Sequence, residues 1–160
     1  TRAESIQGDL RFLQILEDMG CTIEQKGGAV VVEGPQVLHG VTVDMSDISD
    51  TVMSLVAVAP FADSPTTITN IRHIRLKESD RIDAITNNLT NIGIQCEVGD
   101  DFLRVYPGRP ESGVIDSYED HRIAMSFSLV GLLVPGIGIN GSECVAKTCP
   151  EFYEILGKLY

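Results

Sequence analysis

Lysine, arginine and histidine side chains gather where the sequence predicts that helices begin. They are Lys77 and Arg81 at one helix start, His121 and Arg122 at a second, and Lys147 before a third. The N-terminus of a helix carries partial positive charge, so cations are disfavoured there, and Lys77 and Arg81 also repel each other at the i, i+4 spacing. Because helix starts offer unpaired backbone N–H groups as well, three of them on one rim would bind phosphate and carboxylate groups. The pattern therefore predicts a site for a polyanion.

Carboxylates lie beside these cations, and each also has a simpler structural interpretation. Asp50 and Asp120 stand at the starts of two apolar helices, where an aspartate side chain caps free N–H groups. Capping alone is the role that we expect of Asp120, whereas for Asp50 capping and chemistry stay equally open. Glu78 either caps a helix or, between two cations, carries a proton. Together with Asp80 it could instead neutralise the cations locally, which would leave only a solvated helix start.

The order helix, hairpin, long apolar helix and strand occurs twice along the chain. The first copy begins with a predicted helix over Asp9–Met19, and the second with a helix over Asp80–Ile92. Each helix ends at a glycine and is followed by two short strands around a Gly-containing turn. The next helices, over Thr51–Ala62 and Ile123–Val134, are apolar nearly all round, so they belong in the interior. We predict an α/β fold with these helices inside and the hairpins outside.

A short strand and then a lysine follow each apolar helix. The strands are predicted over Thr66–Ile71 and Ile137–Asn140, and the lysines are Lys77 and Lys147. The segment Glu151–Leu159 looks like the first helix of a third copy. We therefore expect one lobe of a larger protein, whose remaining strands come from elsewhere.

Composition limits the remaining possibilities. A chain of 160 residues that are 43% hydrophobic can bury one core, so we expect a single domain over residues 1–160. The net charge of −11 opposes binding to nucleic acid. The sequence has no 18-residue apolar run and no secretory leader, and we expect a cytoplasmic protein without membrane contact.

The four cysteines form no metal-binding or disulfide pattern. Gly136–Gly141 matches G-x-G-x-x-G but opens no helix, so we expect a turn and a strand there and no dinucleotide.

Four segments, in their order and spacing, resemble the signatures of the EPSP synthase family, the 3-phosphoshikimate 1-carboxyvinyltransferases. They are Asp44-Met45-Ser46 through Asp50, Arg75-Leu76-Lys77-Glu78-Ser79-Asp80-Arg81, Asp120-His121-Arg122-Ile123-Ala124-Met125, and Ala146-Lys147-Thr148. The similarity runs from Gln7 to the C-terminus. Any one segment would be modest evidence, and the four together are strong evidence.

The resemblance implies an inverse α/β lobe of repeated βαβαββ units, with buried helices and outer sheets as in enolpyruvyl transferases. The chain would be most of the C-terminal lobe, and without the N-terminal lobe it would be inactive. The family transfers the enolpyruvyl group of phosphoenolpyruvate to the 5-hydroxyl of shikimate 3-phosphate and releases phosphate. This is a step of the shikimate pathway to chorismate and aromatic amino acids, and it needs no metal or organic cofactor. We expect a monomer.

The resemblance also implies roles for single residues. Asp50 resembles the carboxylate that hydrogen-bonds the attacking hydroxyl and takes its proton, and Glu78 resembles the group that protonates the methylene carbon. Lys77 resembles a contact to the shikimate moiety. His73 stands where several family members have an asparagine that touches the shikimate phosphate, which leaves that contact in doubt.

The phosphoenolpyruvate contacts are implied in the same way. Arg81, Arg122 and Lys147 resemble the groups that bind its phosphate and carboxylate, a task suited to the planar fork of arginine. His121 would orient them, although a buried or capping histidine explains the residue equally well.

Two alternative functions stay open. Transferases that pass enolpyruvate to UDP-N-acetylglucosamine share the implied fold, but they lack the combination of K-E-S-D-R and D-H-R-I-A-M seen here. A noncatalytic anion- or RNA-binding module is the other alternative, because βαβαββ units also occur in RNA-processing proteins. The acidic composition and the lack of aromatic residues among the cations disfavour it.

Overall fold

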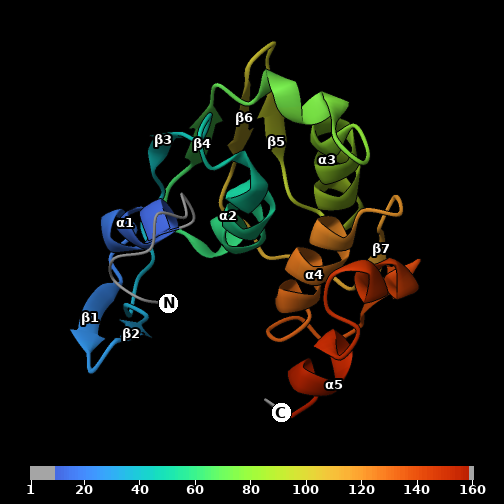
Figure 1. Cartoon of the computed structure of the whole chain (residues 1–160). Coiled ribbons are helices and arrows are strands. Elements are labelled where there is room, and N and C mark those ends of the chain that lie inside the picture. The colour runs from blue at the N-terminus through green and yellow to red at the C-terminus, as the bar shows by residue number, and fades with distance from the viewer. Residues whose placement is uncertain (1–9, 159–160) are drawn as a thin grey trace.

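Helices make up the interior of the molecule. The computed structural model describes residues 10–158, in which α2 (Val52–Val58) packs against α4 (His121–Val130) (Figure 1). Most side chains of both helices are buried, because neither sequence has a polar face wide enough to meet solvent. The prediction of two interior helices is confirmed. Their bounds differ from the predicted ones: α2 ends two residues before Pro60, which has no N–H to continue a helix.

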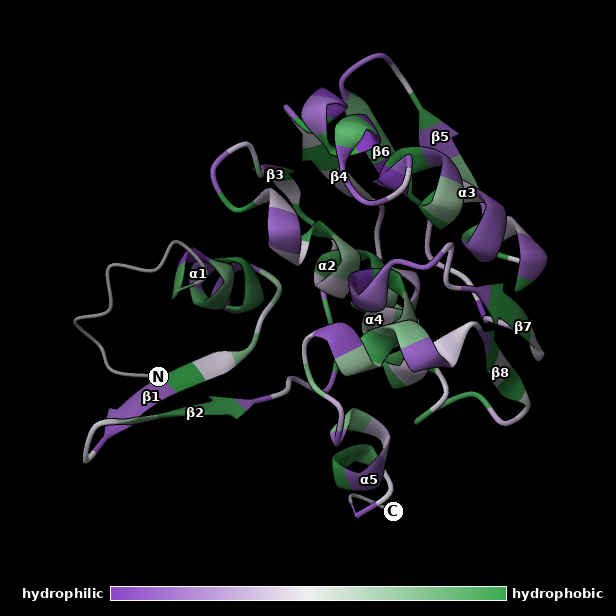
Figure 2. Cartoon of the chain, turned by 45° about the vertical axis from the view of Figure 1, so that its right-hand side comes forward, coloured by the Kyte–Doolittle hydropathy of each residue, from purple (hydrophilic) through white to green (hydrophobic). Residues whose placement is uncertain are grey.

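The described strands form three sheets. The central sheet has the order β3, β4, β6, β5, and its strands are β3 (Thr42–Asp44), β4 (Thr66–Thr69), β6 (Phe102–Val105) and β5 (Cys96–Val98). In it β3 and β4 are parallel, and the other neighbours are antiparallel. The two remaining sheets have two strands each: the antiparallel hairpin of β1 (Thr22–Lys26) and β2 (Ala29–Glu33), and the parallel pair of β7 (Gly113–Asp116) and β8 (Ile137–Asn140). The latter strands, apolar along most of their length (Figure 2), pack against α4.

The internal repeat is present, and its copies are interleaved. Helix α1 (Arg11–Asp18) precedes β1–β2, and α3 (Arg81–Asn91) precedes β5–β6. Both helices end at a glycine with positive φ, Gly20 at 102° and Gly93 at 79°. The hairpin of the second copy joins the parallel pair of the first copy in the central sheet. Sheets therefore form between copies, as well as within them.

Two of the predicted helices extend beyond the residues that the structure describes. Asp9 and Leu159, at the outer ends of two predicted helices, lie outside the described residues. The last helix, α5 (Phe152–Leu156), is shorter than predicted. Gly136 and Gly141 have positive φ at the two ends of β8, so the expected turn and strand are confirmed.

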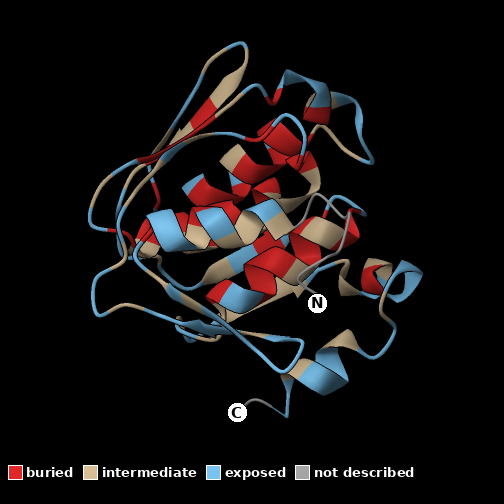
Figure 3. Ribbon diagram, turned by 60° about the vertical axis from the view of Figure 1, so that its left-hand side comes forward, coloured by how far each residue is buried: buried red, intermediate tan, exposed pale blue. Residues whose placement is uncertain are grey.

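One apolar core joins the elements. Its buried side chains run from Ile15 in α1 to Val130 in α4. Buried residues concentrate in the central helices, whereas the β1–β2 hairpin is largely exposed (Figure 3). In the described part of the chain, no helix is long and apolar enough to cross a membrane.

Short 3₁₀ turns lie between the strands and the helices. They include η2 (Ser49–Thr51), η3 (Ala59–Phe61), η4 (Arg72–Leu76) and η5 (Ser142–Lys147). Turns η4 and η5 follow β4 and β8, at equivalent places in the two copies. Lys77 directly follows η4, before α3, and Lys147 is the last residue of η5, before α5.

Gly40, just before β3, allows the close passage of two backbone segments. A Cβ atom at this position would overlap the carbonyl group of Ser64 and lie 2.5 Å from the carbonyl oxygen of Pro65. We therefore expect Gly40→Ala to lower the free energy of unfolding by about 1–3 kcal/mol in urea denaturation. Gly34→Ala is the matched control, because a Cβ there meets nothing within 4 Å. Equal stability of the two variants would contradict the close passage.

Candidate functional site

Arg81, the first residue of α3, is the centre of a cluster of charged side chains. Its side chain is 1% exposed, and each of its nitrogens donates to a carboxylate. Nε donates to Asp120 over 2.7 Å, Nη1 to Asp50 over 3.1 Å, and Nη2 to Glu78 over 2.9 Å. Burial lowers the pKa of Arg81, but the hydrogen bonds and charges of these carboxylates outweigh burial, and the pKa is raised above its usual value. The cluster is therefore built on a buried, permanently charged guanidinium.

Asp120 serves two helices at once. Its Oδ1 accepts from the backbone N–H of Arg122 over 2.9 Å and caps α4, and its Oδ2 accepts from Arg81 at the start of α3. The side chain is fully buried. The expected cap is confirmed, but the expectation that capping is its only role is wrong, because the same carboxylate forms the buried ion pair with Arg81.

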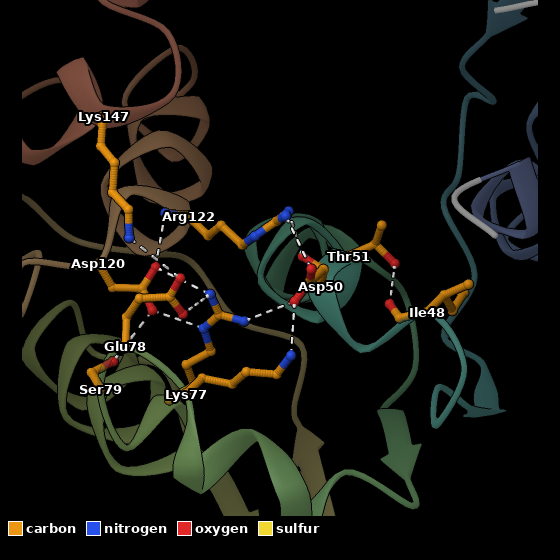
Figure 4. Close-up of polar contacts among 10 residues, drawn as sticks. Ile48, Asp50, Thr51, Lys77, Glu78, Ser79, Asp120, Arg122 and Lys147 are labelled. Atoms are coloured by element: carbon orange, nitrogen blue, oxygen red, sulfur yellow. Dashed lines mark hydrogen bonds and ion pairs between the residues drawn. The ribbon is translucent and has the colours of Figure 1, made fainter. Parts of the chain in front are cut away.

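Asp50 does not cap α2. The N-cap residue of α2 is Thr51, which makes no side-chain capping bond, and Asp50 lies in the preceding turn η2. That turn places the Asp50 carboxylate among three cations (Figure 4): Arg81, Arg122 at 3.1 Å, and Lys77 at 3.6 Å. Burial raises the pKa of Asp50, but the charge of Arg122, the hydrogen bond from Arg81 and the charge of Lys77 together hold it below its usual range. Of the two roles left open, capping is wrong.

Glu78 bridges two of the cations. Its Oε2 accepts from Arg81, and its Oε1 lies 3.8 Å from the Nζ atom of Lys147 (Figure 4). Capping of α3 falls instead to Asp80, which accepts from the backbone N–H of Asp83 and also pairs with Arg75. The alternative in which Glu78 caps a helix is therefore wrong.

The cluster draws on four elements far apart in the sequence. Four cations face three carboxylates, which leaves one net positive charge: Lys77, Arg81, Arg122 and Lys147 against Asp50, Glu78 and Asp120. Lys147 is 66% exposed, and Lys77 and Arg122 are each more than a third exposed. Arg81 can reach an external anion only if one of its carboxylates moves away, whereas the other three cations are already accessible.

The two candidate histidines, His73 and His121, take no part in the ion pairs of the cluster. His121 is 7% exposed at the start of α4, and its Nδ1 has no hydrogen-bond partner among residues 10–158. It lines a cavity of about 150 Å³ together with Asp50, Ser54, Arg122, Met125, Ser126 and Thr148. His73 lies in η4 and lines a different, open cavity of about 640 Å³ that contains none of the clustered residues. Of the two, only His121 therefore shares a cavity with residues of the cluster.

Sequence reasoning missed several features of the site. The Arg81–Asp120 pair joins residues 39 positions apart, and no periodicity signals such a contact. Ser54, Ser126 and Thr148 line the cavity beside His121, yet in the sequence they are only small polar residues with no distinguishing pattern. In the described residues no three His, Cys, Asp or Glu side chains are grouped to hold a metal ion.

Comparison with known proteins gives one consistent result. The sequence model described as EPSP synthase (3-phosphoshikimate 1-carboxyvinyltransferase) matches residues 1–156. A 3-phosphoshikimate 1-carboxyvinyltransferase of Nostoc punctiforme is 47% identical over 150 residues, 94% of this chain and 35% of the relative. A second, from Halalkalibacterium halodurans, is 44% identical over 98% of this chain and 36% of its own length. The chain thus spans little more than a third of these relatives.

Solved structures agree with the sequence relatives. EPSP synthase from Acinetobacter baumannii matches with a TM-score of 0.79 and 32% identity, over 91% of this chain and 38% of that structure. The enolpyruvyl transferase NikO from Streptomyces tendae matches with a TM-score of 0.75 and 25% identity, over 92% and 34%. The mixed α/β fold is therefore that of the enolpyruvyl transferases, as expected.

The lowered pKa of Asp50 predicts how its contribution to stability depends on pH. Its folded pKa lies below the unfolded value, so the ionised carboxylate stabilises the folded chain above the unfolded pKa. This contribution is lost as the pH falls through the folded pKa. We expect Asp50→Asn to be less stable than wild type at pH 7, and the difference to narrow below about pH 4, in urea denaturation at a series of pH values.

The control is Asp100→Asn, which alters an exposed carboxylate in the β5–β6 turn. This variant should differ little from wild type at any pH. A stability difference for Asp50→Asn that stays constant from pH 7 downwards would mean that its charge is not what stabilises the cluster.

Proposed function

The chain belongs to the EPSP synthase family, and we propose that its charged cluster binds phosphoenolpyruvate and shikimate 3-phosphate in one lobe of a two-lobe transferase. The observation that carries the proposal is the convergence of Lys77, Arg81, Arg122 and Lys147 around two partly exposed carboxylates. The reaction moves the enolpyruvyl group to the 5-hydroxyl of shikimate 3-phosphate and releases phosphate. The remaining length of the relatives would supply the other lobe and the rest of the site.

The accessible cations are suited to phosphoenolpyruvate. Arg122 offers a planar fork to a carboxylate or phosphate, and Lys147 offers a compact charge on the other side of Glu78. Arg81 would join them by exchange, because Glu78 and Asp50 occupy its outer nitrogens in the absence of substrate. Binding would thus replace an internal carboxylate with an anionic group of the substrate.

Two carboxylates would carry the proton transfers. Asp50, an ionised carboxylate, accepts the proton of the 5-hydroxyl as that oxygen attacks C2 of the enolpyruvyl group. Glu78 gives a proton to the methylene carbon, C3. Loss of phosphate from C2 and return of a proton from C3 to Glu78 then restore the double bond in the product, and the proton held by Asp50 leaves with the phosphate. No metal or organic cofactor is needed for this balance.

The remaining residues would bind the second substrate and orient the first. Lys77, paired with Asp50, contacts the shikimate moiety near the attacking hydroxyl. His73 donates to the shikimate phosphate in place of the asparagine of other family members. His121 orients Arg122 from the adjoining cavity. We further propose a monomeric, cytoplasmic enzyme.

Titration of the isolated chain with phosphoenolpyruvate tests the site directly. The cations are in place without the other lobe, but they work in open solvent, where each contact is weak. We expect a dissociation constant roughly in the millimolar range, corresponding to about −4 kcal/mol. Amide NMR shifts should cluster at residues 77–81, 120–122 and 147, and should fade as salt screens the charges. Shifts spread over the surface, or centred on Gly136–Gly141, would contradict the site.

Matched carboxyl-to-amide variants sharpen this titration. Glu78→Gln removes a carboxylate that competes for Arg81 and Lys147, so it should tighten binding of phosphoenolpyruvate although it abolishes the proposed proton donor. Asp83→Asn changes a carboxylate of the same helix that pairs with Arg75, outside the cluster, and should leave affinity unchanged. Arg122→Gln should weaken binding. Weaker binding by Glu78→Gln would exclude the exchange of carboxylates.

The isolated chain should not catalyse the transfer, because it contains only the cations of its own lobe. We expect no phosphate release from phosphoenolpyruvate and shikimate 3-phosphate with the purified chain, and turnover with the protein at the full length of its relatives. Turnover by the 160 residues alone would show that the second lobe is dispensable.

A further inference from the structure

Asp120 has more contacts than a helix cap requires. A capping aspartate needs one oxygen for the free N–H groups, and Oδ1 fills this role with the N–H of Arg122. Oδ2 accepts from Arg81 Nε at 2.7 Å, with the hydroxyl of Ser79 at 3.4 Å. Asp120 and Arg81 are both withdrawn from solvent, with side chains 0% and 1% exposed. Oδ1 also accepts from Arg81 Nη2 over 3.4 Å, so both oxygens of this carboxylate serve the guanidinium.

The loop that carries Asp120 is held in an unfavourable conformation. Tyr118 and Glu119, directly before it, have φ values of 51° and 57°, in the left-handed region that residues with a Cβ rarely adopt. Hydrogen bonds hold them there: Tyr118 N–H donates to the Asp116 carboxylate over 2.8 Å, and Glu119 N–H to the Ser117 hydroxyl over 3.3 Å. Surrounding structure thus imposes the position from which Asp120 reaches Arg81.

Helix α3 also forms hydrogen bonds with the other end of this loop. Asn88, which is buried, donates to the carbonyl oxygen of Asp116 over 2.8 Å and accepts from its N–H over 2.9 Å. Asn88 lies seven residues after Arg81, two turns along the same face of α3. The loop is therefore fixed to α3 at both of its ends, by Asn88 at Asp116 and by Arg81 at Asp120.

We propose that Asp120 is a positioning residue for the enolpyruvyl transfer, an inference that rests on the proposed function. It holds the edge of Arg81 formed by Nε and Nη2, so that Nη1 and the second N–H of Nη2 face the place where Asp50 and Glu78 exchange with the substrate anion. Without Asp120 the guanidinium would settle between these two carboxylates, and phosphoenolpyruvate would have to compete with both. Asp120 itself touches no substrate.

Asp120→Asn in the full-length enzyme separates positioning from capping. Asparagine caps helices as well as aspartate does, and Arg81 keeps two other carboxylates, so the variant should fold. It removes the charge and the acceptor that face Nε. We expect the KM for phosphoenolpyruvate to rise by roughly 10- to 100-fold, as for a lost charge-assisted hydrogen bond, with a much smaller change in the KM for shikimate 3-phosphate. Asp80→Asn, which alters the cap of α3, should keep wild-type KM values.

A double-mutant cycle with Arg81→Lys tests whether Asp120 acts through Arg81. If it does, Asp120→Asn should have little further effect in the Arg81→Lys background. A purely structural aspartate would change KM by the same factor in both backgrounds, and this result, or a wild-type KM for Asp120→Asn, would overturn the proposal. Asp120→Thr, which keeps a capping hydroxyl, repeats the cycle if the asparagine variant does not fold. Loss of folding in both variants would assign the residue to the fold and also overturn the proposal.

The wild-type enzyme separates this inference from the function on which it rests. An inactive wild-type enzyme would refute the transferase function. If the wild type is active and Asp120→Asn keeps the wild-type KM for phosphoenolpyruvate, only the positioning role is refuted.

Discussion

The buried pair between Arg81 and Asp120 is the constraint on which the site depends. Withdrawing two opposite charges from water is costly, and breaking such a pair typically costs about 3–5 kcal/mol because one charge is left unpaired. Here the geometry offsets the cost, since Asp120 also satisfies the start of α4 and Arg81 also meets Asp50 and Glu78. The pair therefore fixes the starts of α3 and α4 relative to each other. The other cations take their places from these two helix starts.

A site organised in this way is prepared for anions, and its own carboxylates offset most of its positive charge. The two carboxylates that we propose for proton transfer also compensate the cations, so no large unpaired charge faces solvent before substrate arrives. The same arrangement lowers the pKa of Asp50 and so favours its ionised form. Asp50 and Glu78 would thus serve both charge compensation and catalysis, whereas the fully buried Asp120 compensates Arg81 and takes no part in the chemistry.

The fold was more predictable from the sequence than the site. Hydrophobic pattern and glycine placement predicted the two interior helices, both hairpins and the strand at Gly136–Gly141, because these depend on residues close in the chain. The same reasoning gathered the cations on one rim. It erred at Asp50, since a 3₁₀ turn rather than a cap precedes α2, and at Asp120, whose partner lies in another helix. Contacts between elements depend on how the elements pack, and a local pattern does not contain that information.

The interleaved central sheet bears on how the chain is made. Strand β4 leaves the ribosome before β6, its antiparallel partner, which begins 33 residues after β4 ends, at Phe102. Until then one edge of β4 is open, and an open edge is where nascent chains pair wrongly with one another. The first copy of the repeat therefore cannot complete its sheet as it emerges. Vectorial synthesis must delay the closure of the first copy until the hairpin of the second copy has been translated.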